Sequence, residues 1–399
     1  MEDISTPVHR TRMIYTVNSA AAAALAMLSH QARIGSLGLA FSPGWHETAD
    51  RRDGYFESRW GASETWDDVI LQGPHLYVAT PMYKAVNPTM RHKTDWSATD
   101  FEALPVDAIP VTAYKPIGDK VRYNAGYTQW EFGPARAQYR IAWRTMAAST
   151  NERTLIPCII PPGAAHVDGI FSAGLPHEDN ETICALAGFL GSILLDFAVR
   201  AAPKSTIRTA AVNRLSVLLG HPLQTSLVTR TLRLNCITGA YADLWRDVYQ
   251  DGFTPDRWAG GRDRANRPQL GAVTGMWTSS TPLRVAEDRR QALLEVDALV
   301  ALMLGVTADQ LCTVYRTQFA VLYGYDHRGY VYDANGRLVP SSVLAVWRTK
   351  GDRLSAEERT ATNQAGNTYT YELPFTLLDR EADMREAYAE FERRLAARG

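Results

Sequence analysis

Cysteine is scarce in this chain. Only four cysteines occur among 399 residues, at Cys158, Cys184, Cys236 and Cys312, and none belongs to a CxxC or Cys/His pattern with the spacing of zinc ligands. A structural zinc site is therefore not expected. Three of the four lie in apolar runs, where free cysteine behaves as a small hydrophobic residue. This usage fits the reducing cytoplasm, which is the predicted location.

Long hydrophobic runs are also missing. No stretch of about twenty strongly apolar residues is available to span a bilayer. The run SAAAAALAMLS (Ser19–Ser29) follows two arginines and superficially resembles a secretory signal. However, acidic residues come first, alanine dominates the run, and no small-x-small cleavage site follows it. We predict instead a short helix that packs on the body of the protein, within an N-terminal segment 1–34.

Motifs that carry common chemistry are absent as well. Adenine-N6 methylation needs an Asn/Asp-Pro-Pro-aromatic loop, and the nearest string, Asn87-Pro88-Thr89-Met90, lacks the second proline and the aromatic residue. No Gly-rich cofactor loop, phosphate-binding loop or GxSxG string occurs. No carboxylate cluster with a nearby lysine indicates a metal-dependent nuclease. We therefore predict no catalytic, cofactor-binding or metal-binding residue in this chain.

Two histidine–carboxylate pairs are the remaining candidates for acid/base work. His46 precedes Glu47, and His166 with Asp168 follows the corner Pro161-Pro162-Gly163. Titratable residues close in sequence are common, so a surface or hydrogen-bonded structural role is the preferred interpretation of each pair. Because the corner has no nucleophile or metal ligand at catalytic spacing, a geometric role is favoured for it too.

The net charge of −1 argues neither for nor against binding of nucleic acid, but the charged residues are unevenly distributed along the chain. The segment from Phe197 to Ala242 holds six basic residues and no Asp or Glu, and the segment from Lys115 to Arg153 holds seven basic residues against three acidic ones. Such local excess suits a phosphate backbone, because each neutralised phosphate releases counterions. A solvated surface is an equally good interpretation.

The most regular strand pattern is QYRIAWRTM (Gln138–Met146). Tyr, Ile and Trp alternate there with Arg140, Ala and Arg144, although arginines at i, i+4 and i+8 also permit a helix. Turn residues separate this run from a second apolar run, Thr154–Ile160, so we predict a hairpin with two arginines on one face. Proline at residues 161 and 162 must end the second strand, because it cannot donate to the ladder.

The remaining elements predict an α+β fold in which a mixed sheet and hairpins are packed with helices and the C-terminal part is helical. Aromatic-rich loops and short strands are expected from 35 to 116, with a short helix at Asp95–Pro105. Two glycines, Gly188 and Gly191, favour close packing of one helix. Helices are predicted at Glu181–Ala202, Pro282–Leu304, Thr307–Phe319 and Asp379–Arg398. The predicted domains are a recognition domain at 35–245 and a mostly helical one at 246–399, after segment 1–34.

Several strings together resemble the C-terminal target-recognition region of large adenine-N6 DNA methyltransferases. These include type IIG restriction–modification enzymes and the methyltransferases of the BREX and DISARM phage-defence systems. The order and combination of the strings carry the resemblance, which covers most of the chain from about residue 35. The strings are WDDVILQGPHLYVATPMYK (Trp66–Lys84), YRIAWRTMAASTNERTLIPCIIPPGAAH (Tyr139–His166), RTLRLNCITGAYADLW (Arg230–Trp245) and LLEVDALVALMLGVTADQLCTVYRTQF (Leu293–Phe319).

The resemblance implies a specificity module that docks on double-stranded DNA and presents the target adenine to a separate methyltransferase domain or subunit. S-adenosylmethionine is expected only in that partner, and no cofactor in this chain. Phosphate contacts would position such a module, and base-edge contacts would specify the sequence. The residues predicted to bind DNA are Lys115, Lys120, Arg122, Arg140 and Arg144, with Lys204, Arg208 and Arg214 as a second basic surface. Arg153, beside Glu152 at a strand start, is predicted to stabilise the fold.

Two other functions stay open. The Trp/Tyr-rich first half and the charged C-terminal helix are compatible with a protein-interaction scaffold of a defence complex. A stand-alone nuclease with an unrecognised site is the other alternative.

Overall fold

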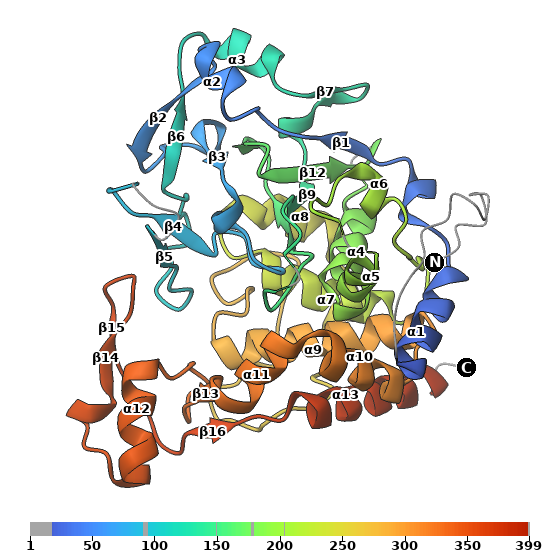
Figure 1. The fold of residues 1–399 in the computed structure, drawn as a ribbon, viewed down its shortest axis with the longest axis vertical. Coiled ribbons are helices and arrows are strands. Elements are labelled where there is room, and N and C mark those ends of the chain that lie inside the picture. Colours follow the sequence, from blue (N-terminus) through green and yellow to red (C-terminus); the bar gives the residue numbers. More distant parts are fainter. Residues whose placement is uncertain (1–17, 91–94, 149, 177–178, 203, 398–399) are drawn as a thin grey trace.

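The computed structural model describes residues 18–90, 95–148, 150–176, 179–202 and 204–397. It has 42% helix and 16% strand in small sheets, which confirms the predicted α+β class and the helical C-terminal part. Figure 1 shows the long helices gathered below and beside a short central sheet, with two smaller lobes projecting from the same side of the molecule.

The central sheet has four antiparallel strands in the order β1-β12-β9-β10. Their bounds are β1 (Ala40–Ser42), β9 (Arg140–Arg144), β10 (Pro157–Ile160) and β12 (Ile170–Gly174). Ile141 pairs with Ile159, so β9 and β10 form the predicted hairpin and the helical alternative for β9 is wrong. Helices cover one face of the hairpin and loops cover the other, so both faces are buried.

The Pro-Pro-Gly corner redirects the chain from one sheet to another. Strand β10 ends at Ile160, and after the four residues 161–164 strand β11 (Ala165–His166) pairs in parallel with β3 (Ile70–Leu71). Gly163 has φ +86°, and a Cβ there would lie 2.9 Å from the Trp66 carbonyl carbon. Glycine is required by both the left-handed backbone and the close approach. The corner is geometric, as the sequence favoured.

The predicted helix Glu181–Ala202 is broken. It forms α4 (Asn180–Gly191) and α5 (Ile193–Ala201), which are bent by 63° at Ser192. Ser192 caps α5, and buried Asp297 accepts a hydrogen bond from the Ile193 amide at 2.8 Å. These polar side chains satisfy backbone donors that a continuous helix would have paired internally, which makes the break stable.

The predicted close packing at Gly188 is confirmed. A Cβ at this position would lie 2.6 Å from Thr231 Oγ1, on the neighbouring helix α7 (Gln224–Asn235). No single helix in the described ranges is long and apolar enough to cross a membrane, and α4 with α5 passes that test only as the bent pair. Both helices are almost entirely buried in the main core.

The other helices complete one large core. Predicted helices at 282–304, 307–319 and 379–398 are confirmed with shorter ends, and α1 coincides with the predicted N-terminal helix. The main core runs from Ala21 to Phe391 and crosses the domain boundary predicted at 245/246, so a cut there would expose buried apolar side chains. The bounds are α1 (Ser19–Ser29), α6 (Thr209–Val212), α8 (Ala242–Val248), α9 (Ala286–Met303), α10 (Ala308–Gln318), α11 (Ala320–Arg328) and α13 (Arg380–Ala396).

A small lobe, here called the upper lobe, projects at the top left of Figure 1. It is built around the antiparallel pair β2/β6 and has its own aromatic core, in which Trp45 stacks on Tyr55 at 4.7 Å. The Trp45 indole donates to Tyr123 Oη at 3.1 Å. Its elements are α2 (Ala49–Arg52), β2 (Phe56–Gly61), β6 (Thr112–Pro116), α3 (Lys120–Gly126), β7 (Gln129–Trp130) and β8 (Gly133–Pro134).

The helix predicted at Asp95–Pro105 is wrong. The segment starts with β5 (Trp96–Ala98), which pairs with β4 (Lys84–Val86), and continues as bends. The Asp100 carboxylate accepts from the Glu102 and Ala103 amides as a helix N-cap would, but Pro105 follows too closely for a helix to develop after it. Asp100 also accepts a 2.7 Å hydrogen bond from Tyr369 of a distant hairpin, and these hydrogen bonds lower its pKa against the opposing effect of burial.

That hairpin belongs to a C-terminal lobe with a separate apolar core. The lobe lies at the lower left of Figure 1. Its elements are β13 (Val331–Tyr332), α12 (Ser341–Lys350), β14 (Thr360–Thr362), β15 (Thr368–Thr370) and β16 (Thr376–Leu377).

Candidate nucleic-acid interface

Lys115 does not reach the surface. It lies on β6 with its residue only 6% exposed, and Nζ donates to Ser63 Oγ at 2.6 Å and to Thr112 Oγ1 at 3.1 Å. Burial, followed by the nearby charge of Arg59, lowers the pKa of this ammonium. The prediction that Lys115 contacts DNA conflicts with this burial, since strand alternation turns the side chain inward.

Arg140 differs most from the prediction that these residues lie at the surface. It is fully buried, and it donates from Nη2 to the Ala164 carbonyl and from Nη1 to Tyr127 Oη at 3.4 Å. Its buried Nε has no partner in the part of the chain that the structure describes. Burial lowers the pKa of its guanidinium. Its donors hold the chain just after the Pro-Pro-Gly corner, so Arg140 stabilises the fold and cannot touch a duplex from this position.

Arg144 lies on the same strand face, as the alternation predicted, and is partly buried. Its Nη2 donates to the Leu76 carbonyl, and its buried Nε has no partner among the described residues. Burial lowers the pKa of this guanidinium as well. The hairpin therefore places its two arginines on one face, but loops cover that face.

Lys120 and Arg122, by contrast, are exposed on α3. Asp119 caps this helix by accepting from the Val121 and Arg122 amides. The Lys120 side chain is 75% exposed, with Nζ 3.6 Å from Asp68. Arg122 lies over the Tyr55 ring at 4.7 Å and donates to the Asp53 carbonyl at 2.8 Å. These two residues are available for phosphate contacts.

Three arginines that sequence reasoning missed lie on the same lobe. Arg51 and Arg52 are exposed on α2, directly before the Asp53 carbonyl that Arg122 bonds, and Arg59 is exposed on β2. They belong to residues 49–61, which the sequence marked only as loops and short strands. They do not form a basic run in the sequence, because acidic residues lie between and beside them.

The second predicted basic surface is separate from the upper lobe. Arg208 and Arg214 are exposed on either side of α6, and Lys204 is half-buried. In Figure 1, α6 lies well to the right of α3. The eight predicted residues thus divide into an exposed pair on α3, a group around α6 that is exposed except for half-buried Lys204, and a covered group on β6 and β9.

Arg153 stabilises the fold, as predicted. Its Nε is 2.7 Å from Asp196, a fully buried carboxylate on α5 that also pairs with Arg200 at 3.2 Å. The Thr154 amide donates to Asp196 as well. This pair of cations on one carboxylate joins the start of β10 to the helical core.

Neither histidine–carboxylate pair is arranged for acid/base chemistry. His166 is fully buried with Nε2 2.8 Å from Ser172 Oγ, and burial, then the charge of Arg140, lowers its pKa to about 3. Asp168 is exposed. Exposed His46 accepts from the Ala49 amide, whereas Glu47 accepts from Tyr114. His166, His46 and Glu47 each bond to a group other than the partner in their pair, which agrees with the structural interpretation.

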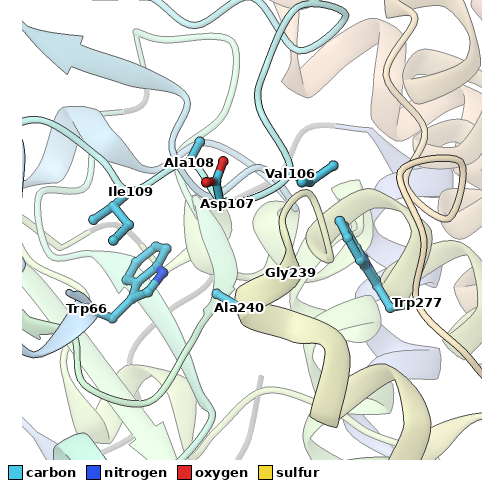
Figure 2. Close-up of a pocket in the computed structure, with 8 residues that line it drawn as sticks. All are labelled: Trp66, Val106, Asp107, Ala108, Ile109, Gly239, Ala240 and Trp277. Carbon is cyan, nitrogen blue, oxygen red and sulfur yellow. The ribbon is translucent and has the colours of Figure 1, made fainter. Parts of the chain in front are cut away.

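One apolar hollow of about 340 Å³ opens between two tryptophans. Figure 2 shows the rings of Trp66 and Trp277 on opposite sides of it, with Asp107 above. The wall residues come from η3 (Trp66–Asp68), the loop before β6, the segment that leads into α8, and the loop before α9. The lining residues are Trp66, Val106, Asp107, Ala108, Ile109, Gly239, Ala240 and Trp277.

Within the described ranges, no group of three or more His, Cys, Asp or Glu side chains is placed to hold a metal ion. All four cysteines are buried as free thiols, and burial raises the pKa of the Cys312 thiol to about 11. No known family and no curated protein matches this chain.

Proposed function

We propose that the chain is a sequence-specific recognition module for double-stranded DNA that works with a separate adenine-N6 methyltransferase domain or subunit. The observation that supports this most is the group of exposed cations on the upper lobe: Lys120 and Arg122 on α3, with Arg51 and Arg52 on the adjoining α2. This group retains two of the residues for which the sequence predicted phosphate contacts.

The acidic neighbours of these cations do not rule out such contacts. Arg52 is 3.2 Å from Asp53, and Lys120 is 3.6 Å from Asp68, but all of these groups are solvent-accessible. Ion pairs at a surface contribute about 1 kcal/mol or less, because water screens them. A phosphate backbone with its condensed counterions can therefore replace them at modest cost.

The aromatic core of the upper lobe would make its cations an efficient contact surface. Trp45, Tyr55 and Tyr123 pack together and fix α3 against β2. Arg122 is already held between Tyr55 and the Asp53 carbonyl, so less side-chain entropy is lost when it meets a phosphate.

The catalytic part of the proposal lies outside this chain. The resemblance of four sequence strings to target-recognition regions supports a partner that carries the methyltransferase chemistry and S-adenosylmethionine, in a BREX, DISARM or related restriction–modification system of the cytoplasm. In that arrangement the present chain would position the duplex and discriminate its sequence.

The test is a salt titration of duplex binding, followed by fluorescence anisotropy of a labelled DNA. Each phosphate contact contributes a slope of about −0.9 to log K against log salt. The triple variant Arg51→Gln, Lys120→Gln, Arg122→Gln should reduce the magnitude of the slope by about 2 to 3. A slope near zero for the native chain would contradict the proposal.

The matched control removes three exposed arginines elsewhere. Arg246, Arg316 and Arg393 each pair with a surface carboxylate outside the upper lobe. Their replacement by Gln removes the same formal charge and should leave the slope within about 1 of the native value. Selection of bound duplexes from a random pool then tests sequence discrimination.

A further inference from the structure

The hairpin β14/β15 of the C-terminal lobe differs in composition from the rest of the chain. Its residues 360–370 read TATNQAGNTYT and contain no charged residue, although charged residues make up 21% of the whole sequence. In the described part of the chain, no further strand pairs with β14 or β15. Proteins usually protect such open strand edges with charge or proline, and this hairpin has neither. Its composition therefore favours a surface that another molecule covers.

One face of the hairpin presents threonine side chains to solvent. Thr360 lies opposite Thr370 and Thr362 lies opposite Thr368, with 2.8 Å between the hydroxyl oxygens of each pair. All four residues are exposed. A hydroxyl has one donor and two lone pairs, so each oxygen keeps hydrogen-bonding capacity beyond its cross-strand bond. The face thus offers hydroxyl and methyl groups in a fixed pattern.

The opposite face of the hairpin is anchored. Ala361 and Tyr369 pack against the apolar core of the lobe. Asp100, in the segment after β5, accepts from Tyr369 Oη at 2.7 Å and from the side-chain amide of Asn367 at 2.8 Å. Within the turn, the Asn367 backbone amide donates to Asn363 Oδ1 at 3.0 Å. A ligand would meet a preformed surface, so little conformational entropy is lost on binding.

The hairpin lies on the same side of the molecule as the cations of the upper lobe. Figure 1 shows β4 and β5 between the two lobes. The Trp60 indole on β2 donates to the Val86 carbonyl on β4 at 2.8 Å, and β4 pairs with β5. The Ala98 amide on β5 donates to Gln364, in the hairpin turn, at 2.7 Å. Contacts between strands therefore run without a break from the upper lobe to the hairpin.

Cations also border the hairpin on its own lobe. Helix α12 contacts β14, and its last turn carries Arg348 and Lys350; Arg353 follows in η9 (Gly351–Arg353). All three residues are exposed. Lys350 pairs with Glu358 at the surface, where water screens the interaction. An uncharged ribbon flanked by cations suits a duplex, because charged groups meet phosphates and uncharged polar groups meet base edges.

The shape of the ribbon also suits DNA. The major groove is about 12 Å wide and admits a two-stranded β-ribbon. A threonine hydroxyl can bond a base edge there, and its methyl group can pack on the methyl group of thymine. The exposed threonine face supplies both kinds of group.

We propose that the β14/β15 hairpin reads bases in the major groove of a duplex whose phosphates are bound by the upper lobe. This inference rests on the proposed function and adds to it the part of the chain that determines sequence preference. Thr362 and Thr368 are the main reading residues. Thr360 contributes less, because its hydroxyl also donates to the Ala356 carbonyl at 2.8 Å and supports the fold.

The experiment starts with the full native chain, which selects its preferred duplex from a random pool. Fluorescence anisotropy then gives the affinity for this duplex and for a scrambled duplex of the same composition. The double variant Thr362→Val, Thr368→Val keeps the branched shape and the charge but removes both hydroxyls. It should reduce the preference at least about fivefold, because base contacts are lost. The salt slope should not change, because phosphate contacts remain.

The matched control is Thr254→Val with Thr317→Val. Both threonines are exposed and lie outside the two lobes, so the native preference should be kept. The urea unfolding midpoint of every variant verifies that it is folded, and the single variant Thr368→Val repeats the test with a smaller change to the hairpin.

A second measurement places 7-deazapurines, which lack the N7 acceptor of the major groove, one at a time in the preferred duplex. At a contacted position this change should weaken binding of the native chain at least about threefold and leave binding of the double variant unchanged. It needs no change to the protein to detect contact with the major groove.

The outcomes separate the two proposals. A salt slope near zero for the native chain contradicts the proposed function and the role of the hairpin together. A steep slope with the same sequence preference in the native chain and the double variant overturns only the role of the hairpin. A native chain that binds duplexes without preference, or that tolerates 7-deazapurines at every position, overturns that role as well.

Discussion

The central sheet and the upper lobe contain the same basic residue types within one stretch of sequence, yet they use them in opposite ways. In the sheet, Arg140 and Arg144 are turned into packed surroundings and donate to main-chain carbonyls. On the lobe, Lys120 and Arg122 point outward from a seven-residue helix. Spacing therefore predicts which side chains share a face, but only packing decides whether that face meets solvent.

The difference has an energetic basis. A buried guanidinium is desolvated, and it remains in place only if its hydrogen bonds compensate for that cost. The buried Nε of Arg140 has no acceptor among the described residues, so the hydrogen bonds of this side chain compensate only in part for its desolvation. An exposed lysine carries almost no such cost. Substitutions in the two regions should consequently differ by several-fold in their effect on stability.

The largest effect is expected for Arg140→Ala. The substitution opens a cavity and leaves the Ala164 carbonyl without its donor, so the free energy of unfolding should fall by about 3 kcal/mol or more. Urea unfolding followed by circular dichroism measures the loss. Arg140→Met is the control, since it keeps most of the volume and removes the buried charge; it should cost less than the alanine variant. A loss below about 1 kcal/mol in Arg140→Ala would mean that this arginine is not buried.

A smaller effect at neutral pH, with a characteristic pH dependence, is expected for replacement of His166. Burial lowers its pKa to about 3 in the folded protein, whereas a histidine in an unfolded chain has a pKa of about 6.5. Below pH 6.5 the unfolded chain therefore binds a proton that the folded chain does not, and stability is lost as the pH falls from 6.5 toward 3. Over that range His166 contributes a slope of about 1.4 kcal/mol per pH unit.

His166→Gln removes this contribution. The dependence of unfolding free energy on pH, measured with urea between pH 6 and about 4, should become less steep by about 1.4 kcal/mol per unit. The slope is compared, and not the absolute stability, because the loss of the Ser172 hydrogen bond lowers stability at every pH. An unchanged slope would show that His166 titrates in the folded protein much as it does in the unfolded one.

The smallest effect on stability is expected for Lys120→Gln. Its side chain is 75% exposed and its ion pair with Asp68 is 3.6 Å long, so unfolding free energy should change by less than about 0.5 kcal/mol. Its duplex affinity at low salt should nevertheless fall. A stability loss similar to that of Arg140→Ala would erase the contrast between the two regions.

Much of the framework was predictable from local patterns. Thr307 and Asp379 cap helices where the sequence indicated, and the alternation in Gln138–Met146 gave the hairpin. The failures came from contacts between distant segments. Asp297 and Ser192 divide one predicted helix into two. The segment predicted as another helix instead forms a strand and bends, and Asp100 docks it on a hairpin more than 260 residues away.

The candidate sites were less predictable than the framework. Acidic residues between Arg51, Arg52 and Arg59 hid the cations of the upper lobe from a search for basic runs. The hollow brings Trp66 and Trp277 together from segments more than 200 residues apart, and neither residue has a local pattern that predicts this arrangement.

The sequence by itself determined the α+β class, the positions of most helices, the strand hairpin and its rigid corner, because these depend on caps, alternation and proline within a few residues of one another. Tertiary structure alone decided which basic residues stay in solvent and where an apolar surface is left open. Burial depends on what packs over a face, and the covering segments come from elsewhere in the chain.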